Sequence, residues 1–197
     1  MRIKKTLFCI GMWCIASVLT TACGGPGYMV STNAPVSISP EVATVVFYRP
    51  SSFGAAYTSA VYDVTTEKTD FLGGVKGRGK VVARVSPGNH TFMVSGENAD
   101  FSYATLEAGK LYYIRIQTRM GFGKMRYSLN PIHSDMIENV QAKVDRCKRY
   151  EKSDESDAWF EKHKDSIENK RTRYFEKWMT KSEAERPGLL STDNVPL

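Results

Sequence analysis

The sequence predicts a mainly β protein, namely a small antiparallel β-sandwich followed by a C-terminal α-helical extension. Between residues 42 and 132, apolar and polar residues alternate in short runs, which is typical of half-buried strands. Turns containing glycine or proline separate these runs, and no helical period lies between them. After residue 133, apolar residues recur every three or four positions, which indicates helices.

The first 22 residues predict a secretory signal peptide. MRIKK is basic, residues 7–19 form an uncharged apolar run of thirteen residues, and TTAC follows. A helix that spans a bilayer needs about 20 apolar residues. A cleaved leader is therefore favoured over a transmembrane anchor.

The residues LTTACGG resemble a bacterial lipobox, in which a small residue precedes a lipidated cysteine. The resemblance implies that Cys23 becomes the first mature residue and carries a diacylglyceryl thioether and an amide-linked acyl chain such as palmitate. Two or three acyl chains make membrane attachment lasting. Gly24, in place of Asp, implies the outer membrane, with the protein facing the periplasm. Ordinary cleavage and an uncleaved anchor are the alternatives.

Charge and cysteine content exclude several classes of protein. The leader removes three of 27 basic residues, so 24 basic and 21 acidic residues leave a mature net charge of +3. Nucleic-acid binding requires clustered positive charge, and we expect no nucleic-acid partner. Cys147 is the one cysteine that remains unmodified after processing, which excludes an internal disulfide and a zinc site of several cysteines.

Residues 23–41 predict the lipidated cysteine and a flexible tether. The segment GGPGYMVSTNAPVSISPE is rich in Gly, Pro, Ser and Thr and has no apolar period. Eighteen such residues reach roughly 20–25 Å. We expect the tether to place the folded domain just clear of the lipid headgroups.

Residues 42–132 predict the β-sandwich, and about 90 residues are enough for such a core. Pro50 ends the first strand, and Pro87 with Gly88 forms a hairpin turn. The expected strands lie in VATVVFYRP, YTSAVYDV, GKVVARVSPGNHTFMVS, SYATLEAGKLYYIRIQT and KMRYSLNPI, of which the third and fourth runs each contain two strands.

Residues 73–82, GGVKGRGKVV, contain most of a phosphate-binding P-loop. Gly74, Gly79 and Lys80 match the motif, but Val81 stands where a Ser or Thr must bind magnesium. A P-loop also precedes a helix, whereas VVARV predicts a strand. We therefore expect a glycine-rich connection and no nucleotide binding.

Three motifs in order resemble a bacterial envelope family, the domain of unknown function 2846: FYRP, then PGNH, then AGKLYY. Members of this family are short lipoproteins or exported proteins. The resemblance covers residues 42–132 and implies a β-sandwich of the transthyretin or PEGA-like kind. It implies no activity and no catalytic residues.

Residues 133–186 predict a helical extension, and residues 187–197 a mobile tail. The second helix should run over residues 157–185, where Pro187 and Gly188 stop it. The first helix starts near Ser134 and carries an apolar stripe at Ile137, Val140, Val144 and Cys147.

Catalytic, cofactor and metal residues are not expected. His90, His133 and His163 fall in three separate elements without metal-ligand spacing, and surface or capping roles suit them. Cys147 could pair with a histidine as a thiol nucleophile. Its place on an apolar stripe instead favours a small buried side chain.

The second predicted helix supplies the candidate partner surface, because it has more aromatic residues than an isolated helix leaves in water. Its alternative role is to dock on the β-sandwich or on the first helix. The candidate residues are Trp159, Phe160, Tyr174 and Trp178.

Two functions follow from these observations. The first is a lipid-anchored structural or accessory interaction module, with the membrane as one partner through Cys23 and an envelope protein as the other. The alternative is a periplasmic ligand- or glycan-binding module that uses exposed Tyr and Arg residues of the sandwich, which concentrate at interface hot spots. The tyrosines in question are Tyr57, Tyr62, Tyr103, Tyr112 and Tyr113, beside Arg49, Arg115 or Arg126.

Overall fold

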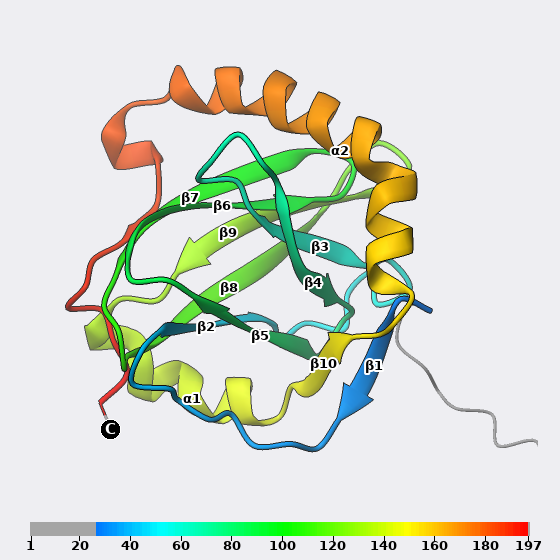
Figure 1. The fold of residues 1–197 in the computed structure, drawn as a ribbon. Coiled ribbons are helices and arrows are strands. Elements are labelled where there is room, and N and C mark those ends of the chain that lie inside the picture. The colour runs from blue at the N-terminus through cyan, green and yellow to red at the C-terminus, as the bar shows by residue number, and fades with distance from the viewer. Residues whose placement is uncertain (1–26, 197) are drawn as a thin grey trace, which may run out of the picture.

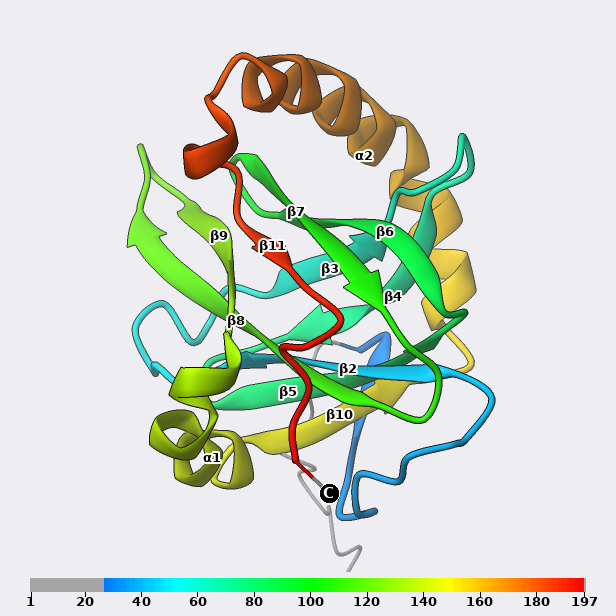
Figure 2. The same cartoon turned by 90° about the vertical axis from the view of Figure 1, so that its left-hand side faces the viewer.

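Two β-sheets stack face to face, and a helix covers the outer face of each (Figure 1). The structure is a computed structural model that describes residues 27–196, so the predicted signal peptide and Cys23 lie outside the described residues. In Figure 2 the layers run from α2 at the top, through the five-stranded and six-stranded sheets, to α1 at the bottom.

The six-stranded sheet has the order β1-β10-β5-β2-β8-β9. Its central strand β2 is buried along its whole length, as its run of Val, Phe and Tyr predicts. Its strands in spatial order are β1 (Met29–Thr32), β10 (Lys148–Lys152), β5 (Gly79–Val85), β2 (Ala43–Arg49), β8 (Leu111–Met120) and β9 (Met125–Pro131).

The five-stranded sheet has the order β11-β7-β6-β3-β4. Hairpins join β6 to β7 and β3 to β4, and both of these hairpin pairs are antiparallel. Its strands in spatial order are β11 (Gly188–Leu189), β7 (Ala99–Leu106), β6 (Gly88–Ser95), β3 (Ser59–Asp63) and β4 (Asp70–Val75).

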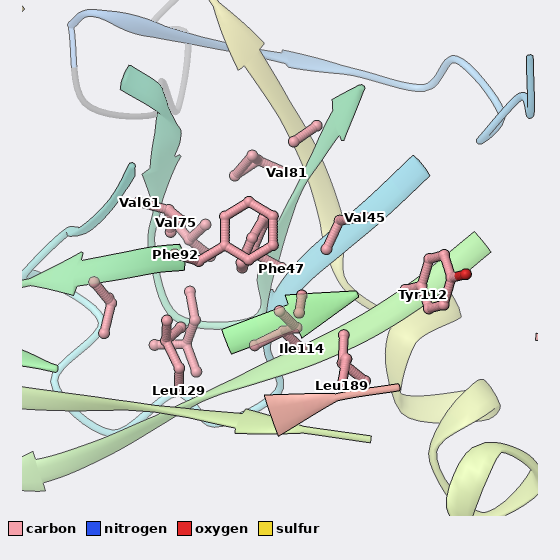
Figure 3. Packing of buried hydrophobic residues seen from close by; sticks show 14 of the residues in the cluster. Val45, Phe47, Val61, Val75, Val81, Phe92, Tyr112, Ile114, Leu129 and Leu189 are labelled. Carbon is pink, nitrogen blue, oxygen red and sulfur yellow. The ribbon is translucent and has the colours of Figure 1, made fainter. Parts of the chain in front are cut away.

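The core between the sheets is made of alternate side chains from both (Figure 3). Phe47 of β2 meets Phe92 of β6 edge to face, with ring centroids 5.1 Å apart. Val61, Val75 and Ile114 are fully buried around them. Period-two alternation therefore produces the interlocked inner faces of a sandwich.

Each helix covers one outer face. Ile137, Val140 and Val144 of α1 pack on Val46 and Tyr48 of the six-stranded sheet. The helix α2 packs its aromatic side chains on the five-stranded sheet. The helical elements are η1 (Ser134–Met136), α1 (Ile137–Asp145), α2 (Ser156–Met179) and η2 (Glu183–Glu185).

The predicted fold class is confirmed: the protein is mainly β, with two sheets and a C-terminal helix. Most pairs are antiparallel, but β2–β8, β5–β10 and β7–β11 are parallel. Two of these parallel pairs involve β10 and β11, which come from segments predicted as helix and tail.

Part of the predicted tether belongs to the fold. Residues 29–32 form β1, which pairs with β10, and Met29 is buried. Val36 and Ile38 then pack beside α1. Arg149 fixes this segment by donating to the carbonyl oxygens of Ala34 and Pro35, at 3.0 and 2.5 Å. Flexible composition is overridden here by contacts with distant residues.

The first helix is shorter than predicted, and the tail is ordered. The helix α1 ends at Asp145, and the residues KRYEK form β10 instead. Cys147 is buried in the turn between them rather than on the helix. In the tail, Leu189 is 2% exposed, and the Val195 N–H donates to the Leu111 carbonyl at 2.7 Å.

The glycine-rich segment is mostly strand. Gly73 and Gly74 lie in β4, and Gly79 begins β5, so only Lys76 to Arg78 connect the two sheets. Lys80 is buried and donates to the Val144 carbonyl at the end of α1, at 2.9 Å. The lysine that would bind phosphate in a P-loop is thus bonded to the C-terminal end of α1.

Candidate functional site

The predicted partner surface on α2 faces the five-stranded sheet. Trp178 is 2% exposed and packs on Phe101 and Tyr103 at centroid distances of 5.8 and 4.7 Å. At the other end of α2, Trp159 stacks on Tyr28 at 3.9 Å. Phe160 and Tyr174 are likewise partly buried against this sheet. The docking alternative therefore accounts for the contacts of these four side chains, and their role as a partner surface stays a prediction.

A cleft of about 630 Å³ lies between the C-terminal half of α2 and the β8–β9 hairpin. We call it the basic cleft, because five cations line it beside one carboxylate and Tyr174. In Figure 2 the hairpin tip projects toward the upper left, on the α2 side of the sheets. The charged lining residues are Asp100, Arg119, Arg126, Arg173, Lys177 and Lys181.

Two carboxylates neutralise part of this charge. Arg126 bonds Glu97 at 2.8 Å, and Lys181 lies 3.8 Å from Asp100. Five cations less these two anions leave a net charge of +3 at the cleft. Like charges are crowded nearby, since burial lowers the pKa of Lys170 and repulsion from Lys124 lowers it further.

The floor of the basic cleft combines aromatic surface with cations. The Arg173 guanidinium and the Lys177 ammonium each lie 5.7 Å from the centroid of the Tyr174 ring. Both side chains are exposed, while Tyr174 is half-buried. Such an arrangement presents charged donors beside an apolar ring, the combination that binds carboxylates at protein interfaces.

Sequence reasoning missed this site, although half of it was visible. Arg173, Lys177 and Lys181 follow at spacings of four, which places them along one side of the predicted helix. The other half comes from β8 and β9, about 50 residues away in the sequence. Only the tertiary fold joins the two.

A second cleft, of about 640 Å³, contains a buried His–Asp pair. His90 Nδ1 lies 2.7 Å from Asp63 Oδ2, and Nε2 lies 2.8 Å from the Ser86 carbonyl. Both ring nitrogens face acceptors, which favours the doubly protonated imidazolium. Neither nitrogen is free to take a proton from a substrate, so the pair is structural and the surface role predicted for His90 is wrong.

The His90–Asp63 pair makes stability depend on pH. The hydrogen bond to Asp63 raises the pKa of His90, more than burial lowers it. Burial raises the pKa of Asp63, but bonds from His90 and Thr65 outweigh it and lower the pKa. The contribution of His90 is present below about pH 6.5 and is lost as pH rises through its raised pKa. The contribution of Asp63 to stability is present above about pH 3.9 and is lost as pH falls through the lowered pKa of Asp63.

We therefore expect His90→Gln to reduce the loss of stability that the native protein shows between pH 6 and pH 9. Urea unfolding at several pH values measures this difference. His163→Gln is the control, because His163 Nδ1 contacts only the Trp159 carbonyl of its own helix among the contacts described. An unchanged pH profile in His90→Gln would show that the pair is not charged in the folded state.

The remaining candidates are accounted for by structure. Burial raises the pKa of Cys147 to about 11, which makes a poor nucleophile. His133 precedes η1 and pairs with Asp193 at 2.9 Å. Within residues 27–196, no group of three or more His, Cys, Asp or Glu side chains is placed to bind a metal ion. The same residues contain no helix long and apolar enough to cross a bilayer.

The tyrosines and arginines of the alternative function are not gathered in one place. Tyr62, Tyr112 and Tyr113 are buried, whereas Tyr57 and Tyr103 are exposed. Arg49 is fully buried, and Arg126 belongs to the basic cleft. Comparison with known proteins adds no assignment: no protein-family model matches the chain, and no curated protein matches it. The resemblance to the envelope family stays a prediction.

Proposed function

We propose that this chain is a lipid-anchored envelope protein that acts by binding, without catalysis, and that the basic cleft takes an acidic segment of a protein partner. The cleft is the observation that supports the proposal. Its net charge of +3 stands beside an aromatic ring, on a surface where three cations have no carboxylate within the described contacts and two of the three flank that ring. Those two cations, Arg173 and Lys177, are the residues we expect to bind the partner.

The architecture favours binding over chemistry. The His90–Asp63 pair has both histidine nitrogens occupied, and burial raises the pKa of the Cys147 thiol to about 11. The helix α2 is fixed by its aromatic contacts, so the backbone positions that carry the cleft cations Arg173 and Lys177 are set before a ligand arrives. Such preorganisation reduces the entropy cost of binding. We propose no nucleotide, nucleic acid or cofactor for this protein.

The test measures binding of a decaglutamate peptide to the purified protein. We expect Arg173→Glu with Lys177→Glu to weaken binding at least about tenfold, since opposed like charges cost several kcal/mol. The control is Lys162→Glu with Lys164→Glu, which makes the same charge change in the N-terminal half of α2. Equal losses in the two variants would mean that net charge alone governs binding.

A further outcome separates the two candidate functions. An acidic oligosaccharide that binds at least as tightly as the peptide, and that also depends on Arg173 and Lys177, would favour the glycan-binding alternative. The ring of Tyr174 suits a sugar face as well as a peptide side chain. A photoreactive residue in place of Tyr174 in intact cells would then identify the ligand by mass spectrometry.

A further inference from the structure

Two apolar loops project from one end of the sandwich. Phe122 in the β8–β9 tip is 97% exposed and Met120 is 68% exposed, the two largest values among the apolar side chains described. Phe53 and Tyr57, between β2 and β3, are 47% and 46% exposed. Leaving four such side chains in water has a cost, because burial of each is worth roughly 1.5–3 kcal/mol.

The β2–β3 loop is fixed by a buried cation. The Arg49 guanidinium donates to the carbonyl oxygens of Phe53, Gly54 and Tyr57 at 2.6, 2.8 and 2.7 Å. Arg49 is itself 0% exposed. The loop therefore presents Phe53 and Tyr57 in a defined conformation.

The hairpin tip is fixed by a carboxylate. Glu97 accepts from the N–H groups of Phe122 and Lys124, both at 3.3 Å, and from Arg126. A Cβ atom at Gly121 would stand 2.5 Å from the Glu97 carboxylate, so this position requires glycine. Gly123 has a φ of +87°, which glycine adopts without strain. Phe122 is thus held outward by a built turn.

The two loops lie side by side. A Cβ atom at Gly54 would meet the side chain of Met125 at 2.8 Å, and Met125 pairs with Met120 across the hairpin. The Tyr127 hydroxyl donates to the Tyr57 carbonyl at 3.3 Å. Cations flank the loops at exposed positions Arg78, Arg119 and Lys124, and the Arg78 N–H donates to the Ser51 carbonyl at 3.2 Å.

The N-terminal segment enters the fold beside the β2–β3 loop. Tyr28 lies against Thr58, next to Tyr57, and both side chains stand about 3 Å from a Cβ built at Gly74. Five residues separate Cys23 from β1, and they span at most about 18 Å. A lipid on Cys23 would therefore bring the loops close to the bilayer surface. The Glu155 carboxylate lies beside Gly27, where the described chain begins. The excess of positive charge is therefore at the loops, around Arg78, Arg119 and Lys124, and not at the entry of the chain.

We propose that this end of the sandwich docks on an anionic lipid bilayer, with Phe122, Met120, Phe53 and Tyr57 inserted among the headgroups. The inference rests on the proposed lipid anchor for the approach to the membrane, and the exposed apolar loops with flanking cations supply the contact itself. Aromatic side chains favour the membrane interface, and cations near them are attracted to anionic lipids. A peripheral contact of this kind fixes the orientation of the domain, and it holds the rim of the basic cleft at the membrane surface, because Arg119 and Met120 also line the cleft.

The experiment places an environment-sensitive fluorophore on Phe122→Cys in the full-length protein purified from membranes. Cys147 does not compete for the label, since it is buried. The control is Leu190→Cys, which is 62% exposed and follows β11 near the opposite end of β8. The proteins are reconstituted in phosphatidylcholine vesicles with and without phosphatidylglycerol, and nitroxide lipids are the quenchers.

We expect the label at position 122 to be quenched in phosphatidylglycerol vesicles at least about fivefold more strongly than the label at position 190. Lys124→Glu with Arg78→Glu should abolish the preference for anionic lipid, and Lys110→Glu with Arg84→Glu, at exposed or half-exposed positions near the other end of β8, should not. Equal quenching at positions 122 and 190 overturns the proposal. So does a Phe122-dependent dimer, because the loops would then bind a second copy.

Vesicle flotation distinguishes this proposal from the anchor. Protein that floats with neutral vesicles, but leaves the label at position 122 in water even on phosphatidylglycerol vesicles, retains the anchor and refutes docking. Protein that floats only with anionic vesicles, and only while Lys124 and Arg78 are intact, lacks the lipid and supports docking. Protein that floats with neither refutes both.

Discussion

Trp178→Ala should lower the free energy of unfolding by about 3–5 kcal/mol, the usual cost of removing a buried tryptophan. Trp178 is 2% exposed and lies between α2 and the five-stranded sheet, against Phe101, Tyr103 and Phe175. Its removal leaves a cavity that rigid strands cannot fill. Urea unfolding with tryptophan-independent detection, such as circular dichroism, measures the change.

The neighbouring residue provides the control for this prediction. Met179 is next in the sequence but 45% exposed, so Met179→Ala should cost less than about 1 kcal/mol. A Trp178→Ala protein as stable as the Met179→Ala protein would mean that α2 is not docked on the sheet in solution. The tryptophan would then be available to a partner, as the sequence first suggested.

Local patterns predicted most of the sandwich. The alternation in residues 42–49 and 111–120 produced β2 and β8, and the Pro87 and Gly88 turn joins β5 to β6 as expected. These strands can be predicted from the sequence because each buries one or both faces in the core, and this burial produces a local pattern of apolar residues. The helical spacing of apolar residues likewise predicted α2 from the sequence.

The errors share one physical cause. The strands β1, β10 and β11 are short, with two to five residues each, and each is stabilised by pairing with a strand far away in the sequence. The residues KRYEK form β10 because they pair with β1 and β5, and the helical stripe that ends before them contains no sign of this. Pairing energy of this kind is absent from any local window.

The candidate sites divide in the same way. The spacing of Arg173 and Lys177 on α2, and of Lys181 just after it, could be read from the sequence, but their meeting with Arg119 could not. Charge counting alone suggested a protein without a basic face, whereas folding collects the cations at one cleft. Net charge therefore constrains the distribution of charge only weakly.

Arg49→Met should destabilise the protein by roughly 2–4 kcal/mol, because three carbonyl oxygens lose a charged donor. Burial lowers the pKa of Arg49, yet the side chain stays charged and is stabilised by the Tyr127 ring, 5.2 Å away. Among the described contacts no carboxylate pairs with it, so the loop carbonyls act as its counter-charge. Arg49→Lys should recover part of the loss, since an ammonium reaches fewer of the three acceptors.

The opposite result has a definite meaning. Replacing a buried charge with an apolar side chain of similar length is neutral or stabilising when desolvation outweighs the bonds. A fully stable Arg49→Met protein would therefore show that Arg49 is retained to shape the β2–β3 loop, not to stabilise the fold. Amide exchange of residues 51–57 separates the two cases, because a loop that loses Arg49 should exchange faster in either. Arg84→Met, an exposed change on β5, should alter neither stability nor exchange. Unaltered exchange in Arg49→Met would remove the structural basis for holding Phe53 and Tyr57 toward the membrane.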